Sequence, residues 1–397
     1  MLRQASSILI LGILLITACS PVEVTPSHSS GKKELPYAED LQKALDQALQ
    51  DGSKEFDLGV SAAVIVPGYE TWIGVSGNSH PGEPITSDML FNVGSVVKSF
   101  EAALALKLVE NNKIDLDLPL SNWLPEYPNI DSQVTVRQLL NHTSGIFNVF
   151  EHPDFPWIGP GVDYYKNRQI GETINSFVAE PYGPPAYAQH YSSTNYLLLT
   201  EILAQTTGES VPQQVRRSFL DPLSLESSFI GMGELPPANF KVAVPWVDVN
   251  LDGKIEDFSG TPYSWIASMT HPILFTTPRD LAVWMQALYS EERVLEEAEL
   301  QEMLDIPETT LLDPEGRKYG LGIIDFSDIL GTYVIGHGGS SLGYSAAVLF
   351  LPEYGISLAW AINTGESPRD LANDLMGETW LALSRVILAN QEIADPN

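Results

Sequence analysis

The spacing of hydrophobic residues predicts helices and strands at both ends of the chain. Leu41, Ala44, Leu45 and Ala48 recur at helical spacing within 37–49. Residues 60–66 and 71–75 then follow the pattern of paired strands. Toward the far end, four apolar runs predict strands and a longer periodic run predicts a helix; these are 319–324, 333–336, 346–351, 356–362 and 371–388.

The middle of the chain has the spacing of helices joined by turns, which determines the fold class. Strands from the two chain ends flank this helical middle, and distant strands are most simply joined in one antiparallel sheet. The sequence therefore predicts an α/β fold of the α+β type: an antiparallel sheet flanked by helices, with an inserted, mostly helical region. No repeat at the period of a solenoid or a propeller is present.

The first residues have the pattern of a signal peptide. A positive start at 1–3 precedes an apolar run at 6–16, which is too short to cross a bilayer. The next residues, Ile16-Thr17-Ala18-Cys19, resemble the bacterial lipobox, in which the cysteine receives a lipid. We expect a signal peptide at 1–19, a tether at 20–36, and an extracytoplasmic protein anchored to a membrane through lipidated Cys19. The alternative is a buried thiol after an uncleaved anchor.

Composition narrows the function classes. The chain has 397 residues, of which 44% are hydrophobic and 18% are charged, as in an ordinary globular protein. Lys and Arg number 21 against 51 Asp and Glu, which gives a net charge of -30. This negative field repels polyphosphates, so a nucleic acid partner is excluded. Cys19 is the single cysteine, so the 37–397 domain must be stabilised by a buried core rather than by disulfides.

The first candidate chemistry is the pair Ser95 and Lys98. The residues that follow Lys98, from Phe100 to Val109, are apolar nearly all round. This pattern predicts a buried helix, with Lys98 inside it near its start. Ser95 and Lys98 share one face near the start of that helix, where free N–H groups favour negative charge. Burial favours the neutral amine, which can accept the serine proton. Ser-x-x-Lys alone is also typical of a helix cap followed by a solvated lysine.

The second candidate is Tyr191, in a polar cluster that opens a helix reaching about Gln205. A tyrosine at a helix start can be held over a cleft, and a nearby lysine cation favours its phenolate form. Such a phenol can relay protons to a leaving group. Taken alone, the segment also fits a packed aromatic residue beside a Ser or Thr cap.

The third candidate is the glycine-rich segment Gly336-His337-Gly338-Gly339-Ser340, between two predicted strands. Glycines there allow a substrate to approach the backbone closely. A simple hairpin that contains a satisfied histidine is the other interpretation.

Together, the three segments resemble those of the penicillin-recognising serine hydrolases, in the branch of class C β-lactamases and D-alanyl-D-alanine carboxypeptidases. Segments 134–146 and 276–281 are also similar to hallmarks of that family. The resemblance implies a β-lactamase/transpeptidase-like fold, with Ser95 as nucleophile and Lys98 and Tyr191 as proton-transfer partners. It also implies an oxyanion hole from the N–H groups of Ser95 and Ser340, and it calls for no cofactor. We assign His142, within 134–146, to loop structure.

Two positions depart from the family pattern and affect substrate binding. Ser193 stands where many relatives have the asparagine of Tyr-x-Asn, and a hydroxyl cannot reproduce the hydrogen-bonding pattern of an amide. His337, Gly338 and Gly339 stand where lactamases have Lys-Thr-Gly. Histidine is mostly neutral at pH 7 and attracts a substrate carboxylate less than lysine does.

We therefore predict a serine hydrolase with a small-molecule or peptide acyl substrate, resembling a D-alanyl-D-alanine carboxypeptidase or a broad esterase. The alternatives are a class C-like β-lactamase and a non-catalytic receptor for peptidoglycan or β-lactams.

A last segment has the opening of a calcium loop: Asp248, Asn250 and Asp252, followed by Gly253. Its twelfth position is Ser259 rather than glutamate. We interpret the segment as a tight Asp-Gly turn between strands and predict no metal site.

Overall fold

The computed structural model describes residues 32–52, 57–156, 169–231, 236–250, 252–259, 272–290, 293–306, 318–365 and 369–390, with the side chains of 369–376 excepted. The chain divides into two units, Met1–Lys32 and the much larger, compact Lys33–Asn397.

One antiparallel sheet dominates the compact unit. Within the described residues it has eight strands in the order β3-β2-β1-β13-β12-β11-β10-β9. Strands from the start of the chain thus lie beside strands from its end, and Val60 pairs with Ile362. The strands are β1 (Gly59–Ile65), β2 (Trp72–His80), β3 (Glu83–Pro84), β9 (Lys318–Tyr319), β10 (Ile324–Asp325), β11 (Ile335–Ser341), β12 (Tyr344–Leu351) and β13 (Ile356–Ile362). The sheet confirms the predicted pairing of the two chain ends.

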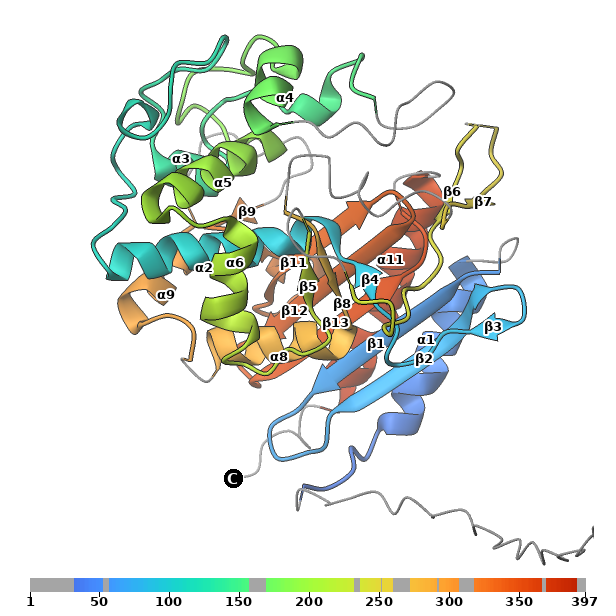
Figure 1. Ribbon diagram of the computed structural model, residues 1–397. Helices are drawn as coiled ribbons and strands as arrows, with labels where there is room; N and C mark the ends of the chain where they lie inside the picture. The colour runs from blue at the N-terminus through green and yellow to red at the C-terminus, as the bar shows by residue number, and fades with distance from the viewer. Residues whose placement is uncertain are drawn as a thin grey trace, which may run out of the picture. The chain divides into compact units, whose positions relative to one another are not determined.

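Helices cover both faces of this sheet, so its central strands are buried on both sides. Helices α1 (Ala38–Gly52) and α11 (Arg369–Ala389) pack against each other, and Leu358 and Trp360 of β13 belong to the same apolar cluster as Leu41 of α1. Helix α8 (Pro278–Tyr289) packs against β1, β12 and β13. It covers the other face of the sheet, where the alternate side chains of β13, Ala359 and Ala361, belong to the second apolar cluster. The strand period of two therefore divides the core into two layers. Figure 1 shows the helices and strands that enclose them.

The middle of the chain is mostly helical, as predicted, and forms the region drawn in teal and green in Figure 1. Helices α2 (Val97–Glu110) and α5 (Ser193–Thr207) lie within it, and most of their residues are buried. Helix α2 is apolar nearly all round, whereas α5 also buries polar residues, among them Thr194 and Asn195. The remaining elements are η1 (Gly94–Val96), α2 (Val97–Glu110), η2 (Leu120–Asn122), α3 (Val136–Leu140), η3 (Val149–Glu151), α4 (Ile170–Phe177), α5 (Ser193–Thr207), α6 (Val211–Val215), the π-turn η4 (Arg216–Leu220), α9 (Glu297–Leu304), α10 (Ser327–Leu330) and the short strands β4 (Phe91–Asn92), β5 (Phe229–Ile230), β6 (Trp246–Val247), β7 (Glu256–Asp257) and β8 (Leu274–Thr276).

Two predicted strand boundaries were wrong. The run at 319–324 is not one strand, because β9 and β10 are paired with each other across a turn at Gly322. Gly322 has φ of 75°, and a Cβ there would lie 2.4 Å from the Cβ of Ala102. The segment from Gly336 to Ser340 lies inside strand β11 rather than between strands. Gly336 and Gly339 in this segment are required by close backbone packing, which local propensity does not register.

Candidate active site

Ser95 lies in the short 3₁₀ turn η1, immediately before α2. Gly94 takes a left-handed conformation with φ of 50°, and its N–H donates to Oδ1 of Asn92 at 2.9 Å. A glycine adopts this conformation without steric cost. The turn therefore places Ser95 at the N-terminal end of a buried helix, the end at which a helix favours negative charge.

Lys98 lies one turn further along, with only 2% of its surface exposed. Its Nζ donates to Oγ of Ser95 at 2.9 Å and to Oγ of Ser193 at 3.4 Å. It also lies 5.1 Å from the ring centroid of Tyr191 and 5.4 Å from that of Tyr196. Lys98 forms no salt bridge within the described part of the chain. Hydroxyls and aromatic faces rather than a carboxylate therefore surround this amine.

Tyr191 completes the arrangement around the serine. It precedes α5, and its hydroxyl donates to Oγ of Ser95 at 2.8 Å. The one oxygen of Ser95 thus has both an amine and a phenol within hydrogen-bonding distance. The structure brings together Ser95, Lys98 and Tyr191, the three residues predicted from the motifs.

Strand β11 supplies the backbone opposite Ser95. Ser341 and Tyr344 flank a two-residue turn and form a hydrogen-bonded pair of the antiparallel ladder. Hydrogen-bonded and non-hydrogen-bonded pairs alternate along such a ladder, so the N–H of the preceding residue, Ser340, points away from β12. On that side β10 reaches only Ile335 and Gly336. A Cβ at Gly94 would lie 2.7 Å from the nitrogen of Ser340. The N–H groups predicted to form the oxyanion hole therefore lie on neighbouring backbones.

The glycines of β11 have separate roles in this packing. A Cβ at Gly339 would lie 2.0 Å from the carbonyl oxygen of Val93 and 2.7 Å from the nitrogen of Ser95. Gly338, in contrast, has open space where a Cβ would project. The first glycine permits the approach of β11 to η1, and the second leaves room beside the strand.

His337 is buried and engaged at both ring nitrogens. Its Nδ1 lies 2.5 Å from the carbonyl oxygen of Gly338, and its Nε2 lies 2.7 Å from the hydroxyl of Tyr319. Because a carbonyl only accepts, Nδ1 carries a proton, and a neutral ring then accepts the tyrosine proton at Nε2. The neutral form of His337 satisfies both bonds, and only 1% of the residue is exposed.

Ser193, the other departure from the family pattern, faces the lysine. Its Oγ accepts from Lys98, and its N–H donates to Oδ1 of Asn148 at 3.2 Å. The hydroxyl thereby helps to hold Lys98 in the site.

Tyr319 and Gln189 support the site but were not found from the sequence. The Gln189 amide pairs with the backbone of Tyr319 in the manner of a strand, accepting from its N–H at 2.9 Å and donating to its carbonyl at 2.7 Å. The same Nε2 donates to the carbonyl of Asn141 at 2.8 Å. No local motif marks these residues, because their partners are far away in the chain.

The segment with the calcium-loop pattern is the turn that joins β6 to β7. The carboxylate of Asp248 accepts the N–H groups of Asp252 at 2.9 Å and Gly253 at 2.8 Å. Asn250 donates to Glu256 at 2.9 Å. Within the residues that the structure covers, no group of three or more His, Cys, Asp or Glu side chains is placed to hold a metal ion.

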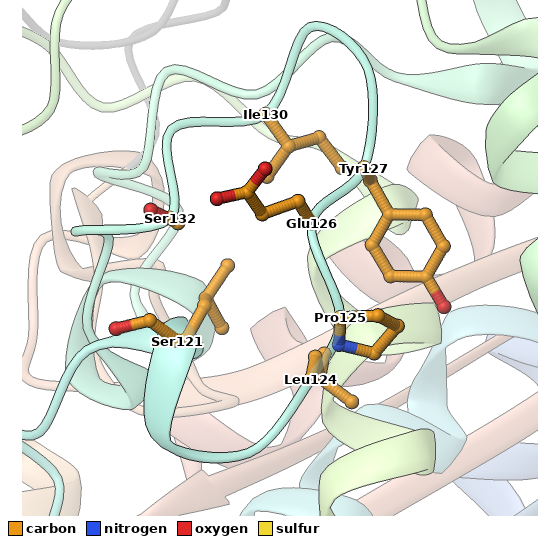
Figure 2. Close-up of a pocket in the computed structure, with 8 residues that line it drawn as sticks. Ser121, Leu124, Pro125, Glu126, Tyr127, Ile130 and Ser132 are labelled. Atoms are coloured by element: carbon orange, nitrogen blue, oxygen red, sulfur yellow. The ribbon is translucent and has the colours of Figure 1, made fainter.

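A separate pocket is lined by residues of η2 and of the loop that follows it (Figure 2). Glu126 and Tyr127 contribute to its wall, together with residues of η2. The Tyr127 hydroxyl donates to Glu201 at 2.6 Å, and burial raises the pKa of the Glu201 carboxyl. None of the three motif residues lines this pocket.

Cys19, residues 1–31 and the signal peptide predicted there lie outside the described residues. Within the described residues, no helix is both long enough and apolar enough to cross a membrane.

Comparison with known proteins gives matches over most of the chain. Residues 45–379 match the family model described as Beta-lactamase. A D-stereospecific amidohydrolase from Streptomyces sp. is 28% identical with a TM-score of 0.72, covering 86% of this chain and 98% of the other. A D-amino acid amidase from Ochrobactrum anthropi SV3 is 27% identical with a TM-score of 0.73, covering 89% and 99%.

A curated relative, Penicillin-binding protein 4* of Bacillus subtilis (strain 168), is 24% identical over 300 residues. The match covers 71% of this chain and 62% of that protein. The chain thus spans less than two thirds of the length of this relative.

Proposed function

Since the chain belongs to the beta-lactamase family of serine hydrolases, we propose that it transfers acyl groups to water through an acyl-enzyme on Ser95. The single observation that carries this proposal is the pair of proton-transfer groups on one oxygen. Lys98 Nζ and the Tyr191 hydroxyl lie 2.9 Å and 2.8 Å from Oγ of Ser95. A nucleophile with a base in hydrogen-bonding reach is the arrangement that covalent catalysis needs.

In the proposed reaction, the proton of Ser95 passes to Lys98 or Tyr191 as Oγ attacks the substrate carbonyl. The oxygen of that carbonyl gains negative charge between the N–H groups of Ser95 and Ser340. Tyr191 then gives a proton to the departing amine or alcohol, which leaves an ester on Ser95. Water hydrolyses this ester by the same proton transfers in reverse order, and Ser95 is restored.

The proposed substrates are esters and amides of D-amino acids, with release of the free D-amino acid. Two observations support this class over peptides with a terminal carboxylate. His337 has both ring nitrogens engaged within the protein, so it is not directed at a substrate carboxylate. The two solved structures with 27% and 28% identity are named as enzymes acting on D-amino acid amides or with D stereospecificity.

The test compares four substrates with the same protein: the p-nitroanilide and an ester of D-alanine, the L-alanine p-nitroanilide, and a peptide ending in D-alanyl-D-alanine. We expect the highest kcat/KM for the D-alanine ester, followed by the D-anilide. Release of D-alanine from the peptide at a higher kcat/KM would instead support a carboxypeptidase.

Intact mass spectrometry with a fluorescent penicillin tests the acyl-enzyme itself. The mass increment should lie on Ser95 and disappear in Ser95→Ala, while the circular dichroism spectrum stays the same. Rapid β-lactam turnover would support the lactamase alternative. A stable adduct with no turnover of any ester would support the receptor.

A further inference from the structure

His142 lies directly behind Tyr191, at the end of the short helix α3. It is fully buried and has φ of 59°, a left-handed conformation. Its Nδ1 accepts the backbone N–H of Ser192 at 3.1 Å and lies 3.1 Å from Nδ2 of Asn195. Because a backbone N–H only donates, Nδ1 is unprotonated, and the ring proton is on Nε2.

The same histidine contacts three consecutive residues around the phenol. Its carbonyl accepts the N–H of His190 at 2.8 Å. Its ring lies 4.4 Å from the ring of Tyr191, centroid to centroid, and its Nδ1 binds the N–H of Ser192. The backbone on each side of Tyr191 and the face of its ring are therefore all held by one residue.

Two further rings keep the imidazole itself in place. The ring of Tyr319 lies 4.5 Å from that of His142, edge-on, and the ring of Tyr196 lies 5.4 Å away. Asn195, which shares the Nδ1 contact, accepts the hydroxyl of Ser144 at 2.7 Å. The imidazole thus has a fixed position and one tautomer.

We propose that His142 is the positioning residue for Tyr191: its neutral ring and Nδ1 hold the phenol at hydrogen-bonding distance from Ser95. This role rests on the proposed function, in which Tyr191 moves the proton. Misplacing a reacting group by about 1 Å costs on the order of 100-fold in rate. His142 acts on the reaction only through Tyr191, so its effect belongs to the rate of acylation and not to substrate binding.

Two substitutions separate the two contacts. His142→Asn places an amide oxygen near the position of Nδ1 and suits the left-handed backbone, so the Ser192 contact is kept while the ring is lost. His142→Phe keeps the ring face and loses the acceptor. His152→Asn is the matched control, because His152 also accepts a backbone N–H at Nδ1, from Asp154 at 3.1 Å, and its ring packs on Phe177.

The main measurement is the single-turnover rate of Ser95 acylation by a nitrophenyl ester, over a range of ester concentrations. We expect both His142 variants to lower the limiting rate by about 10- to 100-fold, with the half-saturating concentration within twofold of the parent. His152→Asn should match the parent. A change confined to the half-saturating concentration, or no change in either variant, would overturn the proposal.

A double-mutant cycle distinguishes positioning from general loss of structure. Once Tyr191→Phe has removed the hydroxyl, adding His142→Asn should slow the residual acylation no further. A fully additive loss would mean that His142 acts on the site independently of Tyr191, which contradicts the proposal.

A third measurement needs neither variant nor turnover. The ¹⁵N spectrum of the parent protein, assigned by comparison with His142→Asn, should show an unprotonated Nδ1 and a protonated Nε2 on His142. The opposite tautomer would overturn the positioning role. If the tautomer is as expected but the parent protein forms no acyl-enzyme with any ester, the proposed function fails while the His142 geometry stands.

Discussion

The hydroxyl of Tyr191 lies 2.8 Å from Oγ of Ser95, although 96 positions separate the two residues in the chain. The contact joins the start of α5 to the turn before α2, and these helices pack against each other. The packing of two buried helices thus creates a pairing that neither segment specifies by itself.

Removal of that hydroxyl should slow the chemical step more than it weakens binding. We expect Tyr191→Phe to lower kcat on an ester by about 10²- to 10⁴-fold, with a smaller change in KM. Stopped-flow kinetics with a nitrophenyl ester measures both. Equal losses in Tyr191→Phe and Tyr187→Phe would contradict this expectation, because Tyr187 is 56% exposed, whereas the Tyr191 hydroxyl donates to Ser95.

The approach of β11 to η1 can be tested at its glycines. In Gly339→Ala, the added Cβ would meet the carbonyl of Val93 at 2.0 Å and must displace one backbone. Loss of one oxyanion donor costs about 10²- to 10³-fold in kcat, and we expect a loss in that range. Gly338→Ala should keep the parent melting temperature, because its Cβ would have open space. Unchanged kcat in Gly339→Ala would show that the oxyanion is stabilised elsewhere.

The two hydrogen bonds of the His337 ring lead to a prediction of how activity depends on the charge of the substrate. Since Tyr319 and Gly338 occupy both ring nitrogens, His337 should not contribute a cation to substrate binding. The ratio of kcat/KM for a carboxylate-bearing ester to that for a neutral ester should therefore be constant between about pH 5 and 8, where histidines ordinarily titrate. A ratio that falls as the pH rises through this range would instead show that a protonated His337 binds the carboxylate.

The ion pair between Arg137 and Asp117 should make a pH-dependent contribution to the free energy of unfolding. Its hydrogen bonds to Asp117, at 2.8 and 3.0 Å, lower the pKa of that carboxyl below its ordinary value of 3.8. The stabilisation is therefore fully present above pH 3.8 and is lost as the pH falls through the lowered pKa. Asp117 is mostly exposed, so Asp117→Asn should cost no more than about 1 kcal/mol at pH 7.

Urea unfolding at several pH values measures this effect. The difference between the parent and Asp117→Asn should shrink toward zero as Asp117 becomes protonated. Exposed Asp154→Asn serves as the control. A difference that is independent of pH would assign the loss to packing rather than to the ion pair.

The sequence also predicts lipid attachment at Cys19. We expect Cys19→Ser to abolish metabolic palmitate labelling in a bacterial host and to release the protein from the membrane fraction or leave it uncleaved. The parent sequence is the positive control. Label retained by the variant would rule out the lipobox interpretation, because the chain has no other cysteine.

The sequence by itself determined the elements with strong periodicity and the residues with local motifs. It predicted one sheet formed by strands from the two ends of the chain. Strand β13 matches the predicted run at 356–362, because strands buried on both faces form uninterrupted apolar runs. It also identified Ser95 and Lys98, since residues three apart on a helix face the same side whatever the rest of the fold does. Tyr191 was a candidate because of its place at a predicted helix start, whereas the oxyanion-hole role of Ser340 came from the family resemblance.

Only the tertiary structure decided what surrounds those residues. It placed Gly336–Ser340 within strand β11 and paired the His337 ring with the hydroxyl of Tyr319. The strand pairing and this side-chain contact both depend on how distant segments pack together. His142 looked like a loop residue in the sequence, yet its ring contacts Tyr191 across 4.4 Å. Hydrogen bonds and ring contacts between segments depend on side-chain positions in three dimensions, and no spacing along the chain encodes them.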